Sequence, residues 1–199
     1  MTPGKRAFDL ALALLIALPV AGLVVVIALA QLLVEGRPVF YRAERMHSRD
    51  TAFGLWKFRT MRPAPGDSGV SGGDKSERIT RLGSVLRRTR LYELPQLWNI
   101  LRGDMSFVGP RPPLRSYVER FPDLYGRVLR NRPGVTGLAS MVYHRHEARI
   151  LGQCRTADET DRAYVGRCIP AKARLDLIYQ RNRSACLDLW ILWRTVFGR

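Results

Sequence analysis

Cysteine and histidine are both scarce in this sequence, with three residues of each among 199. The cysteines, Cys154, Cys168 and Cys186, are odd in number and lie late in the chain. This argues against a disulfide framework and fits a reducing compartment. We do not expect a zinc site either, because the spacing of these cysteines from His144 and His146 matches no usual zinc-binding pattern.

Acidic residues are also in the minority, since 17 Asp and Glu face 33 Lys and Arg, for a net charge of +16 and a pI near 10.9. Such an excess favours a polyanionic partner, which could be nucleic acid, an anionic bilayer face or a phosphorylated substrate. A basic surface that only aids solubility is the alternative. The chain has no helix-turn-helix, zinc-finger or base-stacking motif, so no nucleic-acid partner is expected.

The N-terminal segment has no charged residue from Leu10 to Ala30, and Asp9 is the only one between Ala7 and Val34. About 18 apolar residues are enough for a membrane helix. A cleaved signal peptide is the alternative, but the end of the stretch (31–36) lacks a small-x-small cleavage pattern. We therefore expect this segment to enter a membrane.

Basic residues flank the apolar segment on both sides: Lys5 and Arg6 before it, and Arg37, Arg42, Arg45 and Arg49 after it. The positive-inside tendency would keep both flanks on the cytoplasmic side, which a single straight span cannot satisfy. Pro19 lies near the middle, where it removes a backbone donor and kinks a helix. We expect residues 1–36 to form a re-entrant helix-break-helix that bends at Pro19; an ordinary spanning helix is the alternative.

The remaining residues, 37–199, have the composition of a compact domain. Short aromatic and branched runs at 38–41 and 53–58 predict a β-hairpin with its turn at 46–50. Residues 62–77 are rich in Pro, Gly, Ser and Asp and predict a loop. Helices are expected at 79–90, at 95–103 with Pro95 in the first turn, and at 113–129, 171–179 and 187–194. The fold class is therefore α/β, mostly helical with a small β-hairpin.

The last of these helices carries Trp190 and Trp193 together with Arg194. Tryptophan at this spacing is compatible with a buried core. Tryptophan beside arginine is equally compatible with a membrane interface. The sequence leaves both alternatives open. These tryptophans and the apolar N-terminal surface would also allow a homodimer, although nothing in the sequence requires one.

The segment 91–112 contains the densest collection of chemically useful side chains. It combines Glu93, amide side chains, a Gly-Asp turn and Arg111, whose backbone is restrained by a proline on either side. Arginine binds phosphate through paired, charge-assisted hydrogen bonds, and phosphoryl transfer depends on positioning and charge neutralisation. Together with the cations and hydroxyl of 57–61, the segment predicts a phosphate-binding site; a solvated basic face is the alternative.

The same segments resemble the bacterial sugar transferases, the monotopic phosphoglycosyl transferases. The motifs Lys-Phe-Arg-Thr-Met (57–61), Glu-Leu-Pro-Gln-Leu (93–97), Gly-Asp-Met-Ser (103–106), Gly-Pro-Arg-Pro (109–112) and Arg-Pro-Gly-Val-Thr-Gly (132–137) occur in the family's order. The resemblance covers most of the chain. It implies a magnesium-dependent transfer of sugar 1-phosphate from a UDP-sugar to a membrane polyprenyl phosphate, with release of UMP, which starts polysaccharide or glycoconjugate synthesis.

The resemblance also implies a location and a set of site residues. The chain would sit on the cytoplasmic face of the inner membrane, with a cytoplasmic transferase domain at 37–199 and interfacial helices. Glu93 and Tyr92 are the catalytic candidates, and Glu93 is the candidate magnesium ligand. The candidates for binding the phosphates and the rest of the substrate are Lys57, Arg59, Thr60, Arg87, Gln96, Asp104, Arg111, Arg132 and Thr136.

Tyr92 departs from the family pattern, which usually has an Asp-Glu pair here with the Asp as nucleophile. A carboxylate is a nucleophile and a magnesium ligand, whereas a phenol with an ordinary pKa of about 10 is neutral at neutral pH. Three outcomes remain open. Tyr92 attacks phosphorus with its pKa lowered by arginines, or Glu93 acts as nucleophile or activates the acceptor, or the chain is a catalytically impaired membrane scaffold that binds lipid or a partner transferase.

Overall fold

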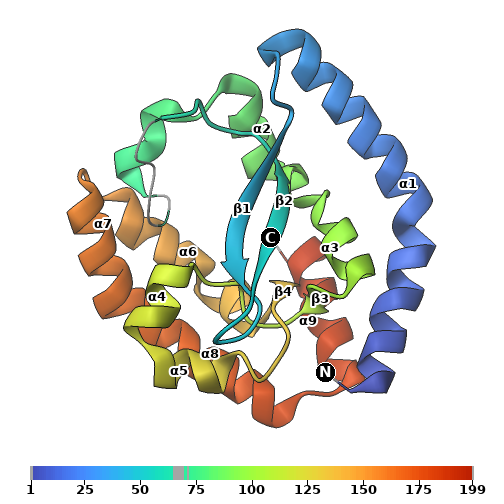
Figure 1. The fold of residues 1–199 in the computed structure, drawn as a ribbon, viewed down its shortest axis with the longest axis vertical. Helices are drawn as coiled ribbons and strands as arrows, with labels where there is room; N and C mark the ends of the chain where they lie inside the picture. The colour runs from blue at the N-terminus through green and yellow to red at the C-terminus, as the bar shows by residue number, and fades with distance from the viewer. Residues whose placement is uncertain (1, 65–69, 71, 199) are drawn as a thin grey trace.

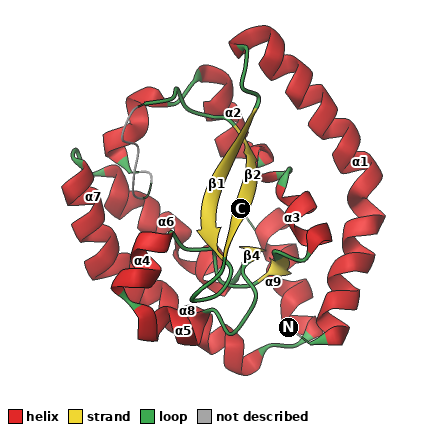
Figure 2. Cartoon of the chain, in the orientation of Figure 1, coloured by secondary structure: helices red, strands yellow, loops and turns green. Residues whose placement is uncertain are grey.

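The structure, a computed structural model, describes residues 2–64, 70 and 72–198. A long N-terminal helix runs along one side of a compact domain in which helices surround two small sheets (Figures 1 and 2). This confirms the mostly helical α/β class predicted from the sequence. Residues 65–69 and 71 of the predicted loop 62–77 lie outside the described residues, and its end forms a short 3-10 helix, η1 (Gly73–Arg78).

Helix α1 (Pro3–Glu35) is continuous and contains Pro19, so the predicted break at Pro19 is corrected to an uninterrupted helix. Thr2 caps its start by accepting a hydrogen bond from the backbone N–H of Lys5, and Gly36 ends it with a φ of 70°. Proline removes one backbone donor, but the leucine-rich and valine-rich turns on either side keep helical geometry. The break was predicted from Pro19 together with the basic residues on both flanks, and the loss of one hydrogen bond does not interrupt this helix.

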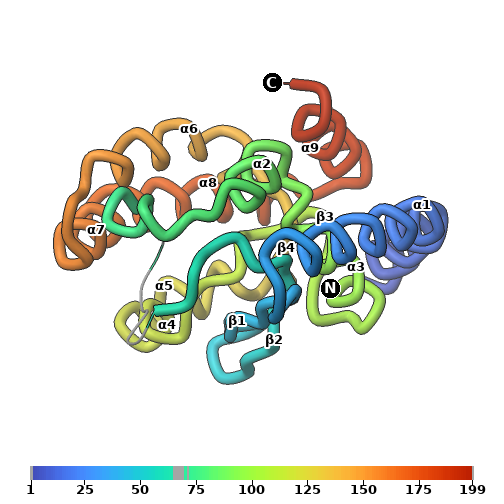
Figure 3. Tube along the Cα trace, turned by 90° about the horizontal axis from the view of Figure 1, so that it is seen from above, coloured from blue at the N-terminus to red at the C-terminus, as the bar shows by residue number. Residues whose placement is uncertain are grey.

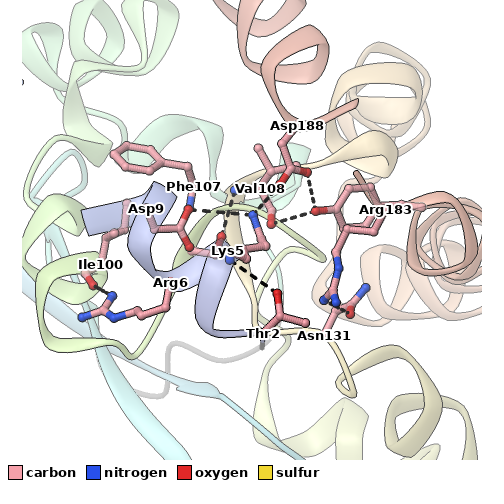
Figure 4. Close-up of polar contacts among 12 residues, drawn as sticks. Thr2, Lys5, Arg6, Asp9, Ile100, Phe107, Val108, Asn131, Arg183 and Asp188 are labelled. Atoms are coloured by element: carbon pink, nitrogen blue, oxygen red, sulfur yellow. Dashed lines mark hydrogen bonds and ion pairs between the residues drawn. The ribbon is translucent and has the colours of Figure 1, made fainter. Parts of the chain in front are cut away.

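The N-terminal end of α1 is attached to the domain by a buried polar cluster (Figure 4). The Lys5 ammonium lies 2.7 Å from an Asp188 carboxylate oxygen. The Arg6 guanidinium donates to the backbone carbonyls of Ile100 and Leu101 over 2.6 and 2.8 Å, at the end of helix α3 (Gln96–Arg102). The Ile100 carbonyl also accepts from the capping N–H of Gly103, and the Arg6 cation is favourable at this C-terminal end of the helix dipole.

The C-terminal end of α1 is attached separately. The Arg59 guanidinium donates to the backbone carbonyls of Glu35 and Gly36, both over 3.0 Å, and the Gln31 side chain donates to the carbonyl of Arg59. Between the two attachments, Leu18 and the residues around it are exposed. Figure 3 shows α1 along the same side of the molecule as α3. The domain is therefore bound to this helix near both of its ends.

Strands β1 (Phe40–Met46) and β2 (Ala52–Phe58) form the antiparallel hairpin that the sequence predicted. Their register pairs Tyr41 with Lys57 and Ala43 with Leu55. Leu55 and Phe58 are buried in the core, and Lys57 lies on the same face of β2 as Leu55, because residues two apart along a strand point to the same side. The hairpin thus places Lys57 near the end of β2.

The segment before α3 is built from two tight turns. Helix α2 (Arg81–Thr89) begins at Thr80, whose hydroxyl accepts from the N–H of Gly83. Arg90 ends α2 in the left-handed region, with a φ of 61°. The 3-10 turn η2 (Leu91–Glu93) follows and leads into α3, which confirms both predicted helices.

Strands β3 (Ser106–Val108) and β4 (Gly134–Thr136) pair in parallel. The chain between them was expected to hold one helix at 113–129. It holds two, α4 (Arg115–Arg120) and α5 (Pro122–Val128), because Phe121 leaves helical geometry and Pro122 starts a new first turn.

The C-terminal half is helical, and its elements are α6 (Leu138–Gly152), α7 (Ala157–Ala163), the π turn η3 (Tyr164–Cys168), α8 (Ile169–Asn182) and α9 (Ala185–Phe197). The helices predicted at 171–179 and 187–194 are confirmed as parts of α8 and α9. Trp190 and Trp193 are half exposed, so they are not core residues. Helices α6 and α8 pack against each other and form one wall of the site described next.

Candidate functional site

A cavity of about 1630 Å³ lies between the end of β2, the turn η2, the loop after β3 and helices α6 and α8. Pockets for single small molecules measure about 300–1,000 Å³. This one is large enough for a nucleotide-sugar and a second head group. Its lining includes seven of the predicted site residues: Lys57, Arg59, Thr60, Arg87, Tyr92, Glu93 and Arg111.

Arg111 and Glu93 form the central ion pair of the cavity. The Nη2 of Arg111 donates to Oε1 of Glu93 over 2.8 Å, and Glu93 is buried with 6% of its side chain exposed. Burial alone would raise the pKa of Glu93, but the charges of Arg111 and Lys57 hold this pKa below its ordinary value. Glu93 is therefore an ionised carboxylate in a strongly cationic setting.

Tyr92 lies between two cations. The Nζ of Lys57 is 6.0 Å and the Cζ of Arg87 is 5.8 Å from the centre of its ring, both within cation–π range. Arg87 is held in place by donating from Nε to Thr60 Oγ1 over 2.9 Å. The aromatic ring therefore occupies the position in which the family motif would place a carboxylate between these cations.

The hydroxyl of Tyr92 donates a hydrogen bond to Glu93, and the pKa of Tyr92 is higher than its ordinary value. Burial is the largest cause that raises the pKa of Tyr92, and the negative charge of Glu93 raises it further, against smaller lowering effects of Arg111 and Arg87. The arginines lower this pKa, but burial and Glu93 outweigh them, so the alternative in which arginines bring the pKa of Tyr92 below its ordinary value does not agree with the site. Tyr92 remains a neutral phenol that donates to Glu93, and a phenolate nucleophile is not favoured.

Lys57 also titrates unusually. Burial in the cavity lowers its pKa to about 7, helped by the charges of Arg111 and Arg45 and opposed by Glu93. The same ammonium would regain its ordinary preference for the charged form beside a diphosphate. Lys57 is thus poised to take up a proton when an anion enters.

Five predicted site residues do not project toward the group of charged side chains around Glu93. The Arg59 guanidinium turns back to the end of α1. Four others do not line the cavity: Gln96, Asp104, Arg132 and Thr136. Asp104 accepts from Asn99 over 3.0 Å, and Thr136 lies 2.8 Å from Thr195 of α9.

Arg132 lies close to the cluster at the start of α1, part of which Figure 4 shows. Burial and the neighbouring Arg6 lower the pKa of its guanidinium, while the charge of Asp104 raises it. These surroundings belong to the attachment of α1 rather than to the cavity. Part of the motif pattern in the sequence therefore coincides with residues that position helix α1.

Sequence reasoning missed several residues that line the cavity, namely Arg45, Glu147, Lys172 and Asp176. Arg45 follows from the hairpin register, because it lies four residues after Tyr41 on the same face of β1. The other three come from α6 and α8, and no local motif marks them. Only the packing of these two helices brings them to the site.

The described residues do not fit a magnesium ion held by protein side chains alone. No group of three or more His, Cys, Asp or Glu in that part of the chain could hold a metal ion. Glu93 already bonds to Arg111 and to the Tyr92 hydroxyl. Magnesium uses one or two carboxylates plus phosphate oxygens, and Tyr92 removes one of the carboxylates that the family motif would offer.

Comparison with known proteins gives a consistent result. The sequence model of the family described as "Bacterial sugar transferase" matches residues 2–198. The UDP-glucose:undecaprenyl-phosphate glucose-1-phosphate transferase of Escherichia coli (strain K12) is 36% identical over 97% of this chain and 39% of its own length. The UDP-N-acetylgalactosamine-undecaprenyl-phosphate N-acetylgalactosaminephosphotransferase of Aeromonas hydrophila is 33% identical over 96% of this chain and 42% of its own length.

A third relative matches along nearly its whole length. The exopolysaccharide production protein PSS of Rhizobium leguminosarum bv. phaseoli is 38% identical over 96% of this chain and 92% of its own length. The chain thus spans about two fifths of the first two relatives and almost all of the third. The family match, residues 2–198, contains every helix and strand of the structure.

Proposed function

Because the chain belongs to the bacterial sugar transferase family, we propose that it transfers a sugar 1-phosphate from a UDP-sugar to a membrane polyprenyl phosphate and releases UMP. The names of the Escherichia coli and Aeromonas hydrophila relatives state this class of donor and acceptor for those proteins. The product would start a polysaccharide or another glycoconjugate.

The observation that carries the proposal is the arrangement of Lys57, Arg87 and Arg111 around the buried carboxylate of Glu93. Fixed cations neutralise the charge of a diphosphate and of the phosphoryl group in transfer. An ionised carboxylate in their midst supplies a nucleophile. A solvated basic face would not bury such a carboxylate to 6% exposure.

We assign the reacting role to Glu93. One of its carboxylate oxygens attacks the phosphorus next to the sugar, the bond from that phosphorus to the bridging oxygen breaks, and the oxygen leaves on UMP. An oxygen of polyprenyl phosphate then attacks the same phosphorus and releases Glu93 as a free carboxylate. Tyr92, a neutral donor to Glu93, orients that carboxylate.

The resemblance implies magnesium, whose usual chemistry is to neutralise charge on transferring phosphates. Because the described side chains do not hold the ion by themselves, the steps above are assigned only to residues of this chain. The cations of the cavity carry the charge neutralisation in this scheme.

We propose that α1 lies in the membrane face without crossing it. At 33 residues it is long enough to span a bilayer, and Leu14, Leu15 and Leu18 are among its many exposed apolar residues. Both ends of α1 are attached to the domain, however. If α1 spanned the bilayer, the charged domain would have to lie beside it within the lipid. The inner membrane and its cytoplasmic face are the compartment we propose, with 1–36 as the membrane segment and 37–199 as the catalytic domain.

Labelling tests the location of the helix. Gly4→Cys lies in the first turn of α1 and Arg37→Cys just after its end, and Gly4 has open space at its Cβ position. We expect both cysteines to react with an impermeant thiol reagent from the same side of sealed membranes, after subtraction of the signal of the unmodified chain. Reaction from opposite sides would show that α1 spans the bilayer.

UMP release tests the reaction. Membranes containing the whole chain, polyprenyl phosphate and each of several UDP-sugars should release UMP with at least one donor, and Glu93→Gln should abolish the release. Glu119→Gln, on the exposed surface of α4, is the matched control and should retain it. Absence of UMP from every donor would contradict the proposal.

The second candidate function is a membrane scaffold with impaired catalysis, and Tyr92 in place of the usual carboxylate favours it. The scaffold would bind polyprenyl phosphate or a partner transferase without turnover. Lipid binding that survives Glu93→Ala, with no UMP released before or after the substitution, would support this candidate.

A further inference from the structure

The wall of the cavity formed by α6 and α8 carries charged residues that the steps above do not use. Glu147 projects from α6, and Lys172 and Asp176 from successive turns of α8. All three line the same cavity as Glu93. Arg111 interacts electrostatically with both Glu93 and Glu147, so the wall around Glu93 and the wall formed by α6 and α8 face the same cation.

Lys172 and Glu147 hold each other in a fixed position. The ammonium of Lys172 lies 2.8 and 3.0 Å from the two carboxylate oxygens of Glu147, and 5.2 Å from the centre of the Tyr164 ring. Their side chains are 11% and 21% exposed. A pair restrained in this way presents polar atoms to a ligand with little loss of side-chain entropy.

Asp176 is different, because it lacks such a partner. It is 8% exposed, and its Oδ1 is buried without a hydrogen bond to any residue that the structure describes. Burial raises its pKa to about 7, with only the charge of Lys172 opposing. A buried polar group without a partner is destabilising, which makes such a group a candidate for contact with a ligand.

The chemistry of this wall differs from that of the wall around Glu93. Carboxylates repel phosphate, but they accept strong hydrogen bonds from neutral hydroxyls. The cations near Glu93 suit the diphosphate, and the carboxyl groups of α6 and α8 suit the uncharged, hydroxyl-rich part of the same molecule. The cavity thus has separate places for the two halves of a nucleotide-sugar.

We propose that Asp176, beside the Glu147–Lys172 pair, binds the hydroxyl groups of the sugar in the donor and selects which sugar is accepted. This inference rests on the proposed function and names the part of the site that recognises the sugar. Asp176 acts as a binding residue and takes no part in the breaking of the diphosphate.

Calorimetry on the whole chain in lipid nanodiscs tests the assignment. UDP is compared with UDP-glucose, UDP-galactose and their two N-acetylhexosamine counterparts, for the unmodified chain, Asp176→Asn, Asp176→Ala and the control Glu119→Gln. We expect UDP affinity to change less than about twofold in every variant. The extra affinity of the best UDP-sugar over UDP should fall about tenfold in Asp176→Ala, in line with the loss of one charge-assisted hydrogen bond.

Asp176→Asn keeps the shape of the side chain and should change the order of preference among the four sugars. A merely structural role would instead lower the melting temperature of Asp176→Asn and leave the ratio of UDP-sugar to UDP affinity unchanged. That ratio, unchanged in both Asp176 variants, would overturn the inference while UDP binding still supports the proposed function. Failure of the unmodified chain to bind UDP or any UDP-sugar would overturn both.

Discussion

Arg111 donates a hydrogen bond to Glu93 over 2.8 Å although the two residues are 18 positions apart and belong to different elements. Glu93 ends the turn η2 before α3, and Arg111 follows β3. The path through α3 and β3 therefore returns the chain to the starting point of that helix. The pair defines the place at which the cations of the cavity meet a carboxylate.

Removal of Arg111 should destabilise the protein. In Arg111→Met, Glu93 stays buried but loses its cation, so the free energy of unfolding should fall by about 1–3 kcal/mol at pH 8. Thermal unfolding in nanodiscs measures this. Arg115→Met breaks the exposed pair with Glu44 and should change stability by less than about 0.5 kcal/mol. Equal effects of the two substitutions would contradict a buried role for Glu93.

Replacement of Tyr92 by a carboxylate should increase turnover. The aspartate of Tyr92→Asp would lie between Lys57 and Arg87, which now flank the ring, and would be an ionised nucleophile. We expect UMP release to rise about tenfold or more. Tyr92→Phe removes only the hydroxyl that contacts Glu93 and should change release by less than about threefold. Loss of release in Tyr92→Asp would show that the phenol has an indispensable role.

The affinity for UDP should depend on pH through Lys57. Its pKa of about 7 leaves it charged at pH 6 and largely neutral at pH 8. Because only the charged form attracts the diphosphate, the affinity should fall by up to about tenfold across this range. Calorimetry at pH 7.5 in buffers of different ionisation enthalpy should show proton uptake on binding. Lys57→Arg stays charged and should remove most of the pH dependence.

Removal of magnesium should leave UDP binding largely intact. The cations around Glu93 neutralise the diphosphate directly, and the described residues provide no group of three metal-binding side chains. UDP affinity measured in EDTA should stay within about threefold of that in magnesium. A loss of a hundredfold or more in EDTA would show that the ion, rather than the arginines, holds the diphosphate.

The stability contributed by Asp176 should fall as pH rises. Its pKa is about 7 in the folded chain against an ordinary value of 3.8, so the folded state holds the extra proton between these values. The stabilisation that comes from protonated Asp176 is fully present below about pH 3.8 and is lost as the pH rises through 7. The free energy of unfolding of Asp176→Asn should therefore exceed that of the unmodified chain by up to about 4 kcal/mol at pH 8. The difference should be smaller at pH 5. An equal difference at both pH values would contradict the shift.

Local patterns in the sequence predicted much of the fold. The hairpin followed from alternation, α2 from its apolar spacing and α3 from Pro95 and Gly103. The motif residues Lys57, Arg87 and Arg111 do meet Glu93 in one cavity. The hairpin and the helices depend on geometry within a few residues, whereas the meeting of the motif residues was implied by the resemblance to the sugar transferases.

Other features depend on long-range packing and could not be predicted in this way. Arg132 and Asp104 belong with the start of α1, which lies about a hundred residues earlier in the chain. Pro19 was expected to break the N-terminal helix. In the structure the turns on either side of Pro19 stay helical, and the helix is continuous. The raised pKa of Tyr92 depends on burial beside Glu93, and burial is set by the assembled fold.

In the membrane placement proposed above, the two attachments of α1 fix how deep the protein sits in lipid. Lys5 and Arg6 hold one end of the helix and Arg59 holds the other, so α1 cannot roll or tilt independently of the domain. A bilayer of different thickness would shift the whole protein as one body and leave the height of Glu93 above the acyl chains unchanged. The distance between a lipid phosphate and Glu93 is therefore set by the protein and does not depend on the thickness of the membrane.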